Sequence, residues 1–507
     1  MNTKFFKVAL ITATLIAAGC GNQSKENTAS GKKDTIVLAQ LSDPKTMDPH
    51  KTTSLYCQRA MTQIYDRLLE IDENMKLIPG LAESWEQIDD HTTVFHLREG
   101  VKFHNGEPLT SEDVYFSIKR AQESPTVAHL YKPITDIETP DDLTVVIKTE
   151  EPFGALLYNL SHKSASILNK KATLAGGENY GQSPVGTGAY KLAEWQAGNF
   201  VKLEKNTDYF RGEPSIPYVL IKAVPEENSK VIGLETGEID IAADLTPFSR
   251  KMLEGNKGSE IHMADGLGVS YIGLNTKSGP LQDKRVRQAL LQGLDRESLI
   301  DSLLMGTVEK AHTFLAPPVF GHGDKNELTH YDYNLEAAKE LLEESGYENL
   351  SFKITTAGDS ATEIAQVAQA NWKELGIDLT IEQIEWGTFL QTTGNGDTDM
   401  FIMSWSPSTG DGDYGLYPNF HSSQVGGSGN RTFFEDSQVD MLLEDAKSTT
   451  DQELRKDLYF QVQEILNEEV PAIPVYFTLV SSGAGNNVNG YYQHPGNISY
   501  FYRFSFE

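Results

Sequence analysis

The sequence has 507 residues and a formal net charge of −29, with 39% hydrophobic and 23% charged residues. This length exceeds one ordinary core and predicts about three units of roughly 150 residues each. The composition is typical of a globular body and not of a disordered chain. The acidic balance argues against electrostatic binding of nucleic acid or anionic lipid, because both require basic surfaces. The simplest interpretation of this charge is solubility, so we infer nothing about the ligand from it.

The first 20 residues have the pattern of a targeting signal. Lys4 and Lys7 precede an apolar stretch, Val8–Ala18, which is too short to cross a bilayer as a mature helix. Small residues and Cys20 follow, so the segment resembles the bacterial lipoprotein signal. The resemblance implies that Cys20 becomes the lipid-modified N-terminus, although Ala17 stands where the family usually has Leu. An ordinary signal peptide with a coincidental cysteine is the alternative.

Residues 21–34 are polar and rich in Gly, Ser, Asn and Lys, so we expect a flexible tether before a body that begins near Thr35. Elsewhere no stretch reaches 18 apolar residues, so no other span is expected. Removal of the signal with its two lysines changes the formal charge from −29 to −31. Cys57 is the only other cysteine, and we expect it to be a small buried apolar residue.

The first part of the body alternates strand and helix patterns. Asn105-Gly106 predicts a tight turn, and Thr110 with Asp113 has the spacing of a capping box. The predicted elements here are strand 34–40, helix 54–72, strand 93–97 and helix 114–121.

Strands also alternate with helices in the second half, which favours a sheet covered by helices on both faces. Ser360 and Glu363 have capping-box spacing at the start of a helix that Gly376 ends. The other elements predicted here are strands 377–386 and 400–405 and the helix 454–466.

Ordered blocks of sequence resemble one family over nearly the whole mature chain. The chain is similar to the family 5 extracellular solute-binding proteins, the peptide- and nickel-binding receptors of ABC importers. The blocks are 81–120 (with AESW, TTVFHLREGVKFHNG and PLTSEDVYFSIKR), 183–195 (SPVGTGAYKLAEW), 271–300 (YIGLNTKSGPLQDKRVRQALLQGLDRESLI), 332–347 (DYNLEAAKELLEESGY) and 470–476 (VPAIPVY).

The resemblance implies an α/β, two-lobe fold of the type II periplasmic-binding-protein kind, with an extra subdomain inserted in lobe I. Lobe I would comprise residues 35–265 and 479–507, with the subdomain at about 58–184, and lobe II residues 266–478. The two chain crossings would lie near GLGVSYIGLN and IPVYFTLVS, and both segments are rich in strand-forming residues.

No catalytic constellation stands out. The motifs GxSxG, HExxH and GxxxxGK[ST] are absent from the sequence, and its twelve histidines are scattered. Asp411 and Asp413 look partly like a calcium loop, but the remaining ligands of such a loop are missing. We therefore expect no enzyme, no cofactor and no metal site, with an extracellular hydrolase as an alternative.

The stretch after Trp405 departs from the pattern of many peptide-binding relatives, in which an Asp three residues after a Trp holds the peptide's ammonium group. Ser408 occupies that place here, and Asp411 and Asp413 come later. The run WSPSTGDGD resembles instead the W-S-x-x-T-G-[DE]-x-D loop of bacterial glutathione-binding receptors. Residues 359–369 also lack the Arg that is typical of dipeptide receptors.

Cationic and aromatic side chains complete the candidate site. Arg59 and Arg431 could pair with ligand carboxylates, with surface salt bridges as the alternative. Tyr56, Tyr271 and Trp405 could line the cleft, with core packing as the alternative; Tyr414 and Tyr417 are further aromatic candidates. The predicted ligand-binding set is Tyr56, Arg59, Tyr271, Trp405, Ser406, Thr409, Asp411, Asp413 and Arg431.

The sequence predicts a monomeric, lipid-anchored receptor outside the cytoplasmic membrane, which closes two lobes over a small peptide and delivers it to an ABC permease and ATPase. Dipeptides, oligopeptides and glutathione are all included. Nickel or a nickel chelate is the alternative ligand. A signalling or adhesion lipoprotein of the same fold is the alternative class.

Overall fold

The computed structural model describes residues 33–277 and 279–507, so the predicted signal (1–20), Cys20 and nearly all of the tether (21–34) lie outside the described residues. Asp34–Glu507 form one compact unit. Within the described ranges, no helix combines the length and the apolar character needed to cross a membrane.

One mixed sheet of ten strands runs through the body in the order β14-β13-β15-β12-β16-β11-β1-β10-β9-β8. β1 is parallel to β10 and β11, β13 is parallel to β14 and β15, and β12 is antiparallel to β15 and β16. The strands are β1 (Thr35–Gln40), β8 (Tyr190–Gln196), β9 (Phe200–Lys205), β10 (Tyr218–Ala223), β11 (Ile241–Ala243), β12 (Ser259–Leu274), β13 (Ser351–Thr356), β14 (Asp378–Gln383), β15 (Met400–Trp405) and β16 (Ala472–Gly485).

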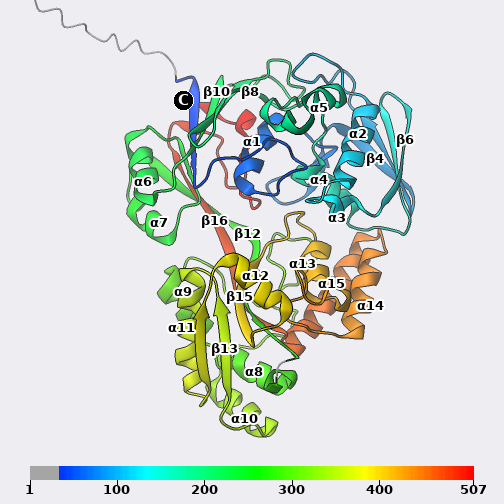
Figure 1. The fold of residues 1–507 in the computed structure, drawn as a ribbon. Helices are drawn as coiled ribbons and strands as arrows, with labels where there is room; N and C mark the ends of the chain where they lie inside the picture. Colours follow the sequence, from blue (N-terminus) through cyan, green and yellow to red (C-terminus); the bar gives the residue numbers. More distant parts are fainter. Residues whose placement is uncertain (1–32, 278) are drawn as a thin grey trace, which may run out of the picture. The chain divides into compact units, whose positions relative to one another are not determined.

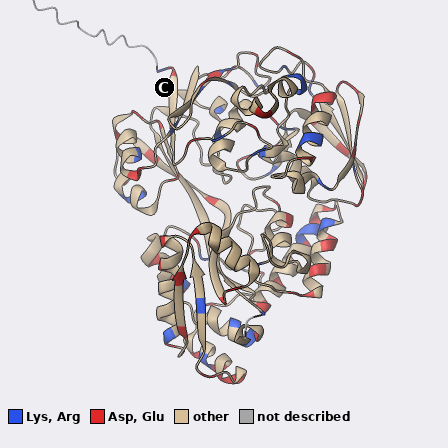
Figure 2. Ribbon diagram, viewed as in Figure 1, with Lys and Arg blue, Asp and Glu red and all other residues tan. Residues whose placement is uncertain are grey.

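β12 and β16 join the two halves of this sheet (Figure 1). They pair side by side along most of their length, and the register shifts between Asp265 and Val269. β16 carries no charged residue, and charged positions are sparse along both strands (Figure 2). Because the predicted crossings fall on these strands, we keep the predicted division as a proposal: lobe I (35–265 and 479–507) and lobe II (266–478).

A separate antiparallel sheet, β4-β5-β7-β6, lies within the proposed extra subdomain. Its strands are β4 (Ala82–Asp89), β5 (Thr92–Leu97), β6 (Ile134–Asp141) and β7 (Thr144–Thr149), and its helices are α2 (Ser111–Gln122), α3 (Ala128–Tyr131), α4 (Leu156–Ser161), η1 (Lys163–Ala165), α5 (Lys170–Gly176) and η2 (Gly177–Gln182). Two small hairpins, β2–β3 (Leu69–Ile71, Leu77–Pro79) and β17–β18 (Val488–Asn489, Ser505–Phe506), complete the strands of lobe I.

The remaining helices are divided between the two proposed lobes. Those of lobe I are α1 (Leu55–Ile64), α6 (Glu227–Thr236), α7 (Pro247–Leu253) and η5 (Phe501–Arg503). Those of lobe II are η3 (Gly279–Gln282), α8 (Lys284–Gln292), α9 (Arg296–Leu304), α10 (Leu335–Ser345), α11 (Asp359–Lys373), α12 (Trp386–Asn395), α13 (Gly412–Phe420), η4 (Ser422–Gln424), α14 (Ser437–Lys447) and α15 (Gln452–Glu469).

Several sequence predictions are confirmed. The predicted strand over 400–405 is β15, and the predicted helix over 454–466 lies within α15. Thr110 and Asp113 form the expected capping box of α2, and Gly106 adopts a positive φ of 83° in the expected turn. Cys57 is buried and unpaired, as expected.

Three local predictions are wrong. The helix predicted over 54–72 ends at Ile64, because Tyr65 is extended and the following segment pairs as β2. Ser360 does not cap α11, whose N-cap is Gly358 without a side-chain bond. The run WSPSTGDGD, expected to be a loop from its resemblance, leads directly into α13, which begins at Gly412 because the Asp411 side chain caps it.

Candidate ligand-binding site

The loop after β15 folds back onto the last residue of that strand. Trp405 pairs with Val269 of β12 at the centre of the sheet. Its indole Nε1 donates to the carbonyl of Tyr414 over 2.9 Å, and the two rings lie 5.6 Å apart. The structure therefore brings Trp405 together with the acidic loop and with the start of α13, as the candidate site requires.

Asp411 forms a fully buried ion pair inside lobe II. Arg455 of α15 donates to both of its carboxylate oxygens, over 2.7 and 2.9 Å, and both side chains are 0% exposed. The Tyr459 hydroxyl lies 3.4 Å from the same carboxylate. Asp411 also caps α13 by accepting from the amide of Asp413. We therefore do not retain Asp411 as a ligand contact, because its oxygens already hold a buried cation and a helix terminus.

Asp413 lies in the first turn of α13 and has no such partner. Its carboxylate is half-buried and makes no hydrogen bond or ion pair with the described residues. Burial and the neighbouring Asp411 raise the pKa of Asp413 to about 6, against the weaker opposite effect of Lys447 and Arg455. An unpaired, partly buried carboxylate is a suitable acceptor for an ammonium group.

The proposed extra subdomain contributes side chains to this region that no sequence motif marks. His129 of α3 stacks on Tyr414 at 5.7 Å, and Tyr158 of α4 packs against Phe320 of lobe II at 5.6 Å. The amide of Gly154 donates to the carbonyl of Lys447 over 2.9 Å. Figure 1 shows α3 and α4 facing α13, α14 and α15.

Arg431 is a second unpaired charge in lobe II. Its Nη1 donates to the carbonyl of Leu390 over 2.6 Å and contacts Thr393 Oγ1 at 2.7 Å. The side chain is buried and meets no carboxylate among the described residues, and burial lowers its pKa. The Tyr271 ring is buried nearby, between Phe314 and Phe401. A buried guanidinium without a counter-ion is a candidate for a ligand carboxylate.

In lobe I, the two predicted residues have different surroundings. Arg59 donates to both carboxylate oxygens of Asp244, over 2.7 and 2.8 Å, and to the carbonyl of Asn497, so it is held within the lobe. Tyr56 is half-buried, and its carbonyl accepts from Gln40 at the carboxyl end of β1. Gln40 is fully buried with its Oε1 unpartnered, and the sequence analysis missed it because an apolar strand ends there without a motif.

The two remaining predicted residues belong to the turn before α13. Ser406 is exposed, and Thr409 is buried with its hydroxyl accepting from the amide of Asp411 over 3.3 Å. Thr409 therefore shapes the turn that places Asp411 and Asp413.

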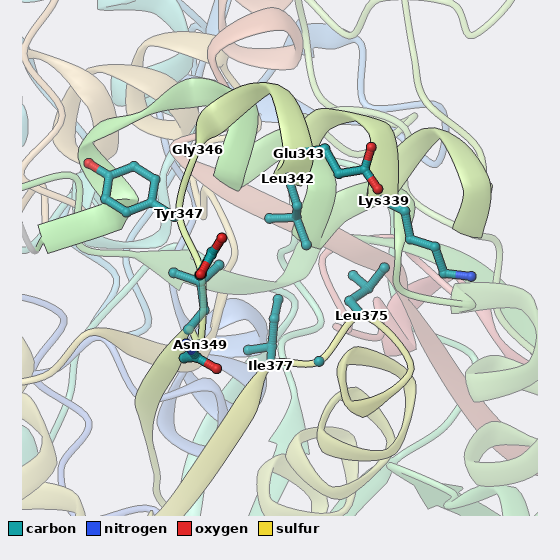
Figure 3. A pocket seen from close by; sticks show the side chains of 11 residues that line it. Lys339, Leu342, Glu343, Gly346, Tyr347, Asn349, Leu375 and Ile377 are labelled. Atoms are coloured by element: carbon teal, nitrogen blue, oxygen red, sulfur yellow. The ribbon is translucent and has the colours of Figure 1, made fainter.

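A surface pocket of about 570 Å³ lies elsewhere on lobe II, between the ends of α10 and α11 (Figure 3). Leu342, Leu375 and Ile377 group in its middle, with Lys339 and Tyr347 to either side. None of the predicted site residues lines it, so it adds nothing to the candidate site. Over residues 33–277 and 279–507, no cluster of three or more His, Cys, Asp or Glu could hold a metal ion.

Comparison with known proteins points to one family. The family described as bacterial extracellular solute-binding proteins, family 5 middle, matches residues 76–427. The chain is 30% identical over 503 residues to the glutathione-binding protein GsiB of Escherichia coli (strain K12), with 96% of each chain covered.

It is 28% identical over 526 residues to the oligopeptide-binding protein AppA of Bacillus subtilis (strain 168), covering 96% of this chain and 95% of AppA. The structure of AppA in complex with a nonapeptide matches with a TM-score of 0.75, over 93% of this chain and 99% of that one. HbpA2 from Haemophilus parasuis matches with a TM-score of 0.86 at 28% identity, over 93% and 100% of the two chains. These neighbours have the type II periplasmic-binding-protein fold predicted from the sequence.

Proposed function

Because the chain belongs to family 5 of the bacterial extracellular solute-binding proteins, which are transport receptors and not enzymes, we propose that it captures small peptides, glutathione included, for an ABC importer. The printed names of its relatives support a peptide-type ligand. GsiB is a glutathione-binding protein, and AppA is an oligopeptide-binding protein whose structure holds a nonapeptide.

The free carboxylate of Asp413 carries the proposal. Peptides and glutathione share an ammonium group, and such a group needs a carboxylate partner once water is excluded. Asp413 offers one, half-buried and without a partner, whereas Asp411 is already held by Arg455.

Arg431 is the proposed partner of a ligand carboxylate. It is the cation of the predicted set that meets no acid among the described residues, since Arg59 is bound to Asp244. Tyr271 and Tyr56 line the same cleft in this proposal. Gln40 Oε1, unpartnered at the end of β1, accepts from a ligand amide of the peptide, because ligands of open α/β sheets bind at the carboxyl ends of strands.

The receptor works outside the cytoplasmic membrane, held by lipid on Cys20 through the 21–34 tether, as a monomer. Ligand bound between the lobes makes contacts that the open form lacks, so it shifts the population towards the closed form. The permease recognises that closed form, and the ATPase then drives uptake.

A thermal-shift screen of the soluble body from Thr35 tests this function. The panel contains dipeptides, oligopeptides, oxidised and reduced glutathione, and nickel. A peptide at 100 times its dissociation constant should add about 2.7 kcal/mol to the free energy of unfolding. A shift with nickel and with no peptide would overturn the ligand class. Unchanged peptide uptake in a strain that lacks the gene would show a non-transport role.

A further inference from the structure

Met75 occupies a turn position that its own hairpin does not favour. It lies in the turn between β2 and β3 with a φ of 59°. This left-handed region is unfavourable for a residue with a Cβ, and glycine or asparagine usually occupies it. The turn is otherwise well satisfied, because Asp72 Oδ1 accepts from the amides of Asn74 and Lys76, each over 2.9 Å. The reason for a methionine here therefore lies outside the hairpin.

The Met75 side chain packs against the other proposed lobe. It is 6% exposed, although connecting turns usually face water. It belongs to an apolar cluster whose other members, Ile71 and Tyr158 apart, all lie between residues 266 and 478. Its Cε is so close to Gly410 that a Cβ built on that glycine would lie 2.7 Å from it. Met75 therefore fills the space beside Gly410, which we call the Gly410 seat.

The Gly410 seat adjoins the turn that places Asp413. The amide of Gly410 donates to the carbonyl of Pro407 over 2.9 Å, and its carbonyl accepts from the amide of Phe320 over 2.9 Å. The next residue is Asp411, which caps α13 by accepting from the amide of Asp413. A side chain from lobe I thus contacts the turn that positions the proposed ammonium partner. Because its two sides belong to different lobes, this contact is lost when the lobes part.

We propose that Met75 is a redox-sensitive latch and a site of reversible oxidation by hydrogen peroxide. As a thioether it helps to hold the lobes closed, and as a sulfoxide it no longer fits the Gly410 seat. In the reaction, the sulfur attacks one peroxide oxygen, the O–O bond breaks as the S–O bond forms, and the other oxygen leaves as water. The sulfur loses two electrons and the peroxide gains them. The role of the latch in holding a peptide rests on the proposed function.

The chemistry of the seat explains why a sulfoxide does not fit. Oxidation adds a polar oxygen to a side chain that is packed among apolar groups. The amide of Gly410 is already bonded to Pro407, so it is not available to that oxygen. An added atom in such a close contact also overpacks the seat. Peroxide reaches the buried sulfur when the lobes part, so a ligand that keeps them together should protect Met75.

Peptide mapping by mass spectrometry after a short peroxide pulse tests the access to the sulfur. Bound oxidised glutathione or trialanine should slow the oxidation of Met75 at least several-fold. The same ligands should leave the oxidation of Met252 and Met441 unchanged, because these side chains are 41% and 54% exposed. Equal rates for Met75 with and without a bound peptide would overturn the proposal.

Two methionine variants provide the matched controls. Met75→Leu keeps an apolar side chain of similar volume that peroxide does not oxidise. Peroxide treatment, stopped with catalase, should raise the dissociation constant of the unaltered protein for either peptide at least several-fold. That of Met75→Leu should stay at its value before treatment, whereas Met252→Leu on α7 should respond as the unaltered protein does. Equal losses of affinity in all three proteins would assign the effect to another methionine, and the proposal would be wrong.

X-ray scattering without ligand separates this proposal from the proposed function. Oxidation should increase the radius of gyration of the unliganded protein and should leave that of Met75→Leu unchanged. If this difference is found while no peptide binds, the proposed function is wrong and the latch stands. If the two proteins respond to peroxide alike in scattering, the latch is wrong, whatever the ligand is.

Discussion

Asp411 and Asp413 are two positions apart but have different electrostatic surroundings. Asp411 turns inward onto Arg455, so its charge is neutralised where water cannot reach. Asp413 keeps a half-buried carboxylate without a partner, next to that same ion pair. A buried pair of this kind is costly to break, whereas an unpaired acid is costly to keep ionised. Carboxylates with a pKa raised in this way are concentrated at functional sites, where a bound ligand can supply the missing partner.

Asp413→Asn should therefore stabilise the unliganded protein at pH 7. The folded-state pKa of about 6 lies above the ordinary 3.8, so the folded state binds this proton more tightly than the unfolded state does. Stability then falls as pH rises from about 4 to 6 and stays lower above that window, by at most about 3 kcal/mol. Urea unfolding at pH 4 and pH 7 measures the difference, and the variant should gain only at pH 7. A variant that is less stable at pH 7 would contradict an unpaired carboxylate.

Peptide affinity should depend on pH through the same group. An ammonium ligand binds the ionised carboxylate, so affinity should fall as pH drops below about 6, by at most tenfold per pH unit. Titration calorimetry between pH 4.5 and 8 measures this dependence. Asp413→Asn should bind weakly and show a flat profile over the same range. An unchanged pH profile in that variant would assign the ammonium group to another residue.

Asp411→Asn should destabilise the fold whatever the ligand. The substitution leaves Arg455 buried without its counter-charge, which costs about 3–5 kcal/mol. The neighbouring Lys456→Met removes an exposed ion pair with Glu453 and should cost less than about 1 kcal/mol. Equal losses in the two variants, measured by urea unfolding, would contradict the structural role of Asp411.

At the scale of elements, the sequence predicts correctly those helices, strands and caps that are determined by nearby residues. β15 and the capping box of α2 depend on residues within a few positions of each other. The end of α1 at Ile64 does not depend on nearby residues alone. It ends there because the next segment, which contains the buried Arg67, continues into β2 and pairs with β3. Asp411 was assigned from its loop alone, since its partner Arg455 lies 44 residues further along the chain.

The crossing strands make a second prediction at this scale. Gly268 donates to Thr478 Oγ1 over 3.0 Å where the register of β12 and β16 shifts, and a Cβ on Gly268 would lie 2.9 Å from that oxygen. Gly268→Ala should cost about 1–3 kcal/mol by overpacking, and Thr478→Ala about 1 kcal/mol through the lost bond. Because Thr478→Ala also removes the clashing atom, the double variant should cost less than the sum. Additive costs in urea unfolding would place the strain elsewhere.

At the scale of the whole molecule, the family resemblance predicts the two-lobe fold. It does not predict which residues form the contacts between the lobes. Met75 of the β2–β3 turn reaches Gly410, and Tyr158, Gly154 and His129 meet lobe II from the extra subdomain. These residues lie hundreds of positions from their partners, and no periodicity or motif marks them. In the proposed division, the subdomain therefore supplies a second contact between the lobes, besides β12 and β16.

If this second contact holds the lobes together, weakening it should lower the apparent affinity for peptide. His129→Ala removes a ring pair worth about 0.5–1.5 kcal/mol, so it should reduce the closed population and raise the apparent dissociation constant roughly two- to tenfold. X-ray scattering should also show a larger radius of gyration without ligand. His96→Ala, on β5 of the same subdomain, should change neither quantity, because that ring pairs with Glu86 and not with lobe II. Unchanged affinity and scattering in His129→Ala would show that this ring pair does not help to hold the lobes together.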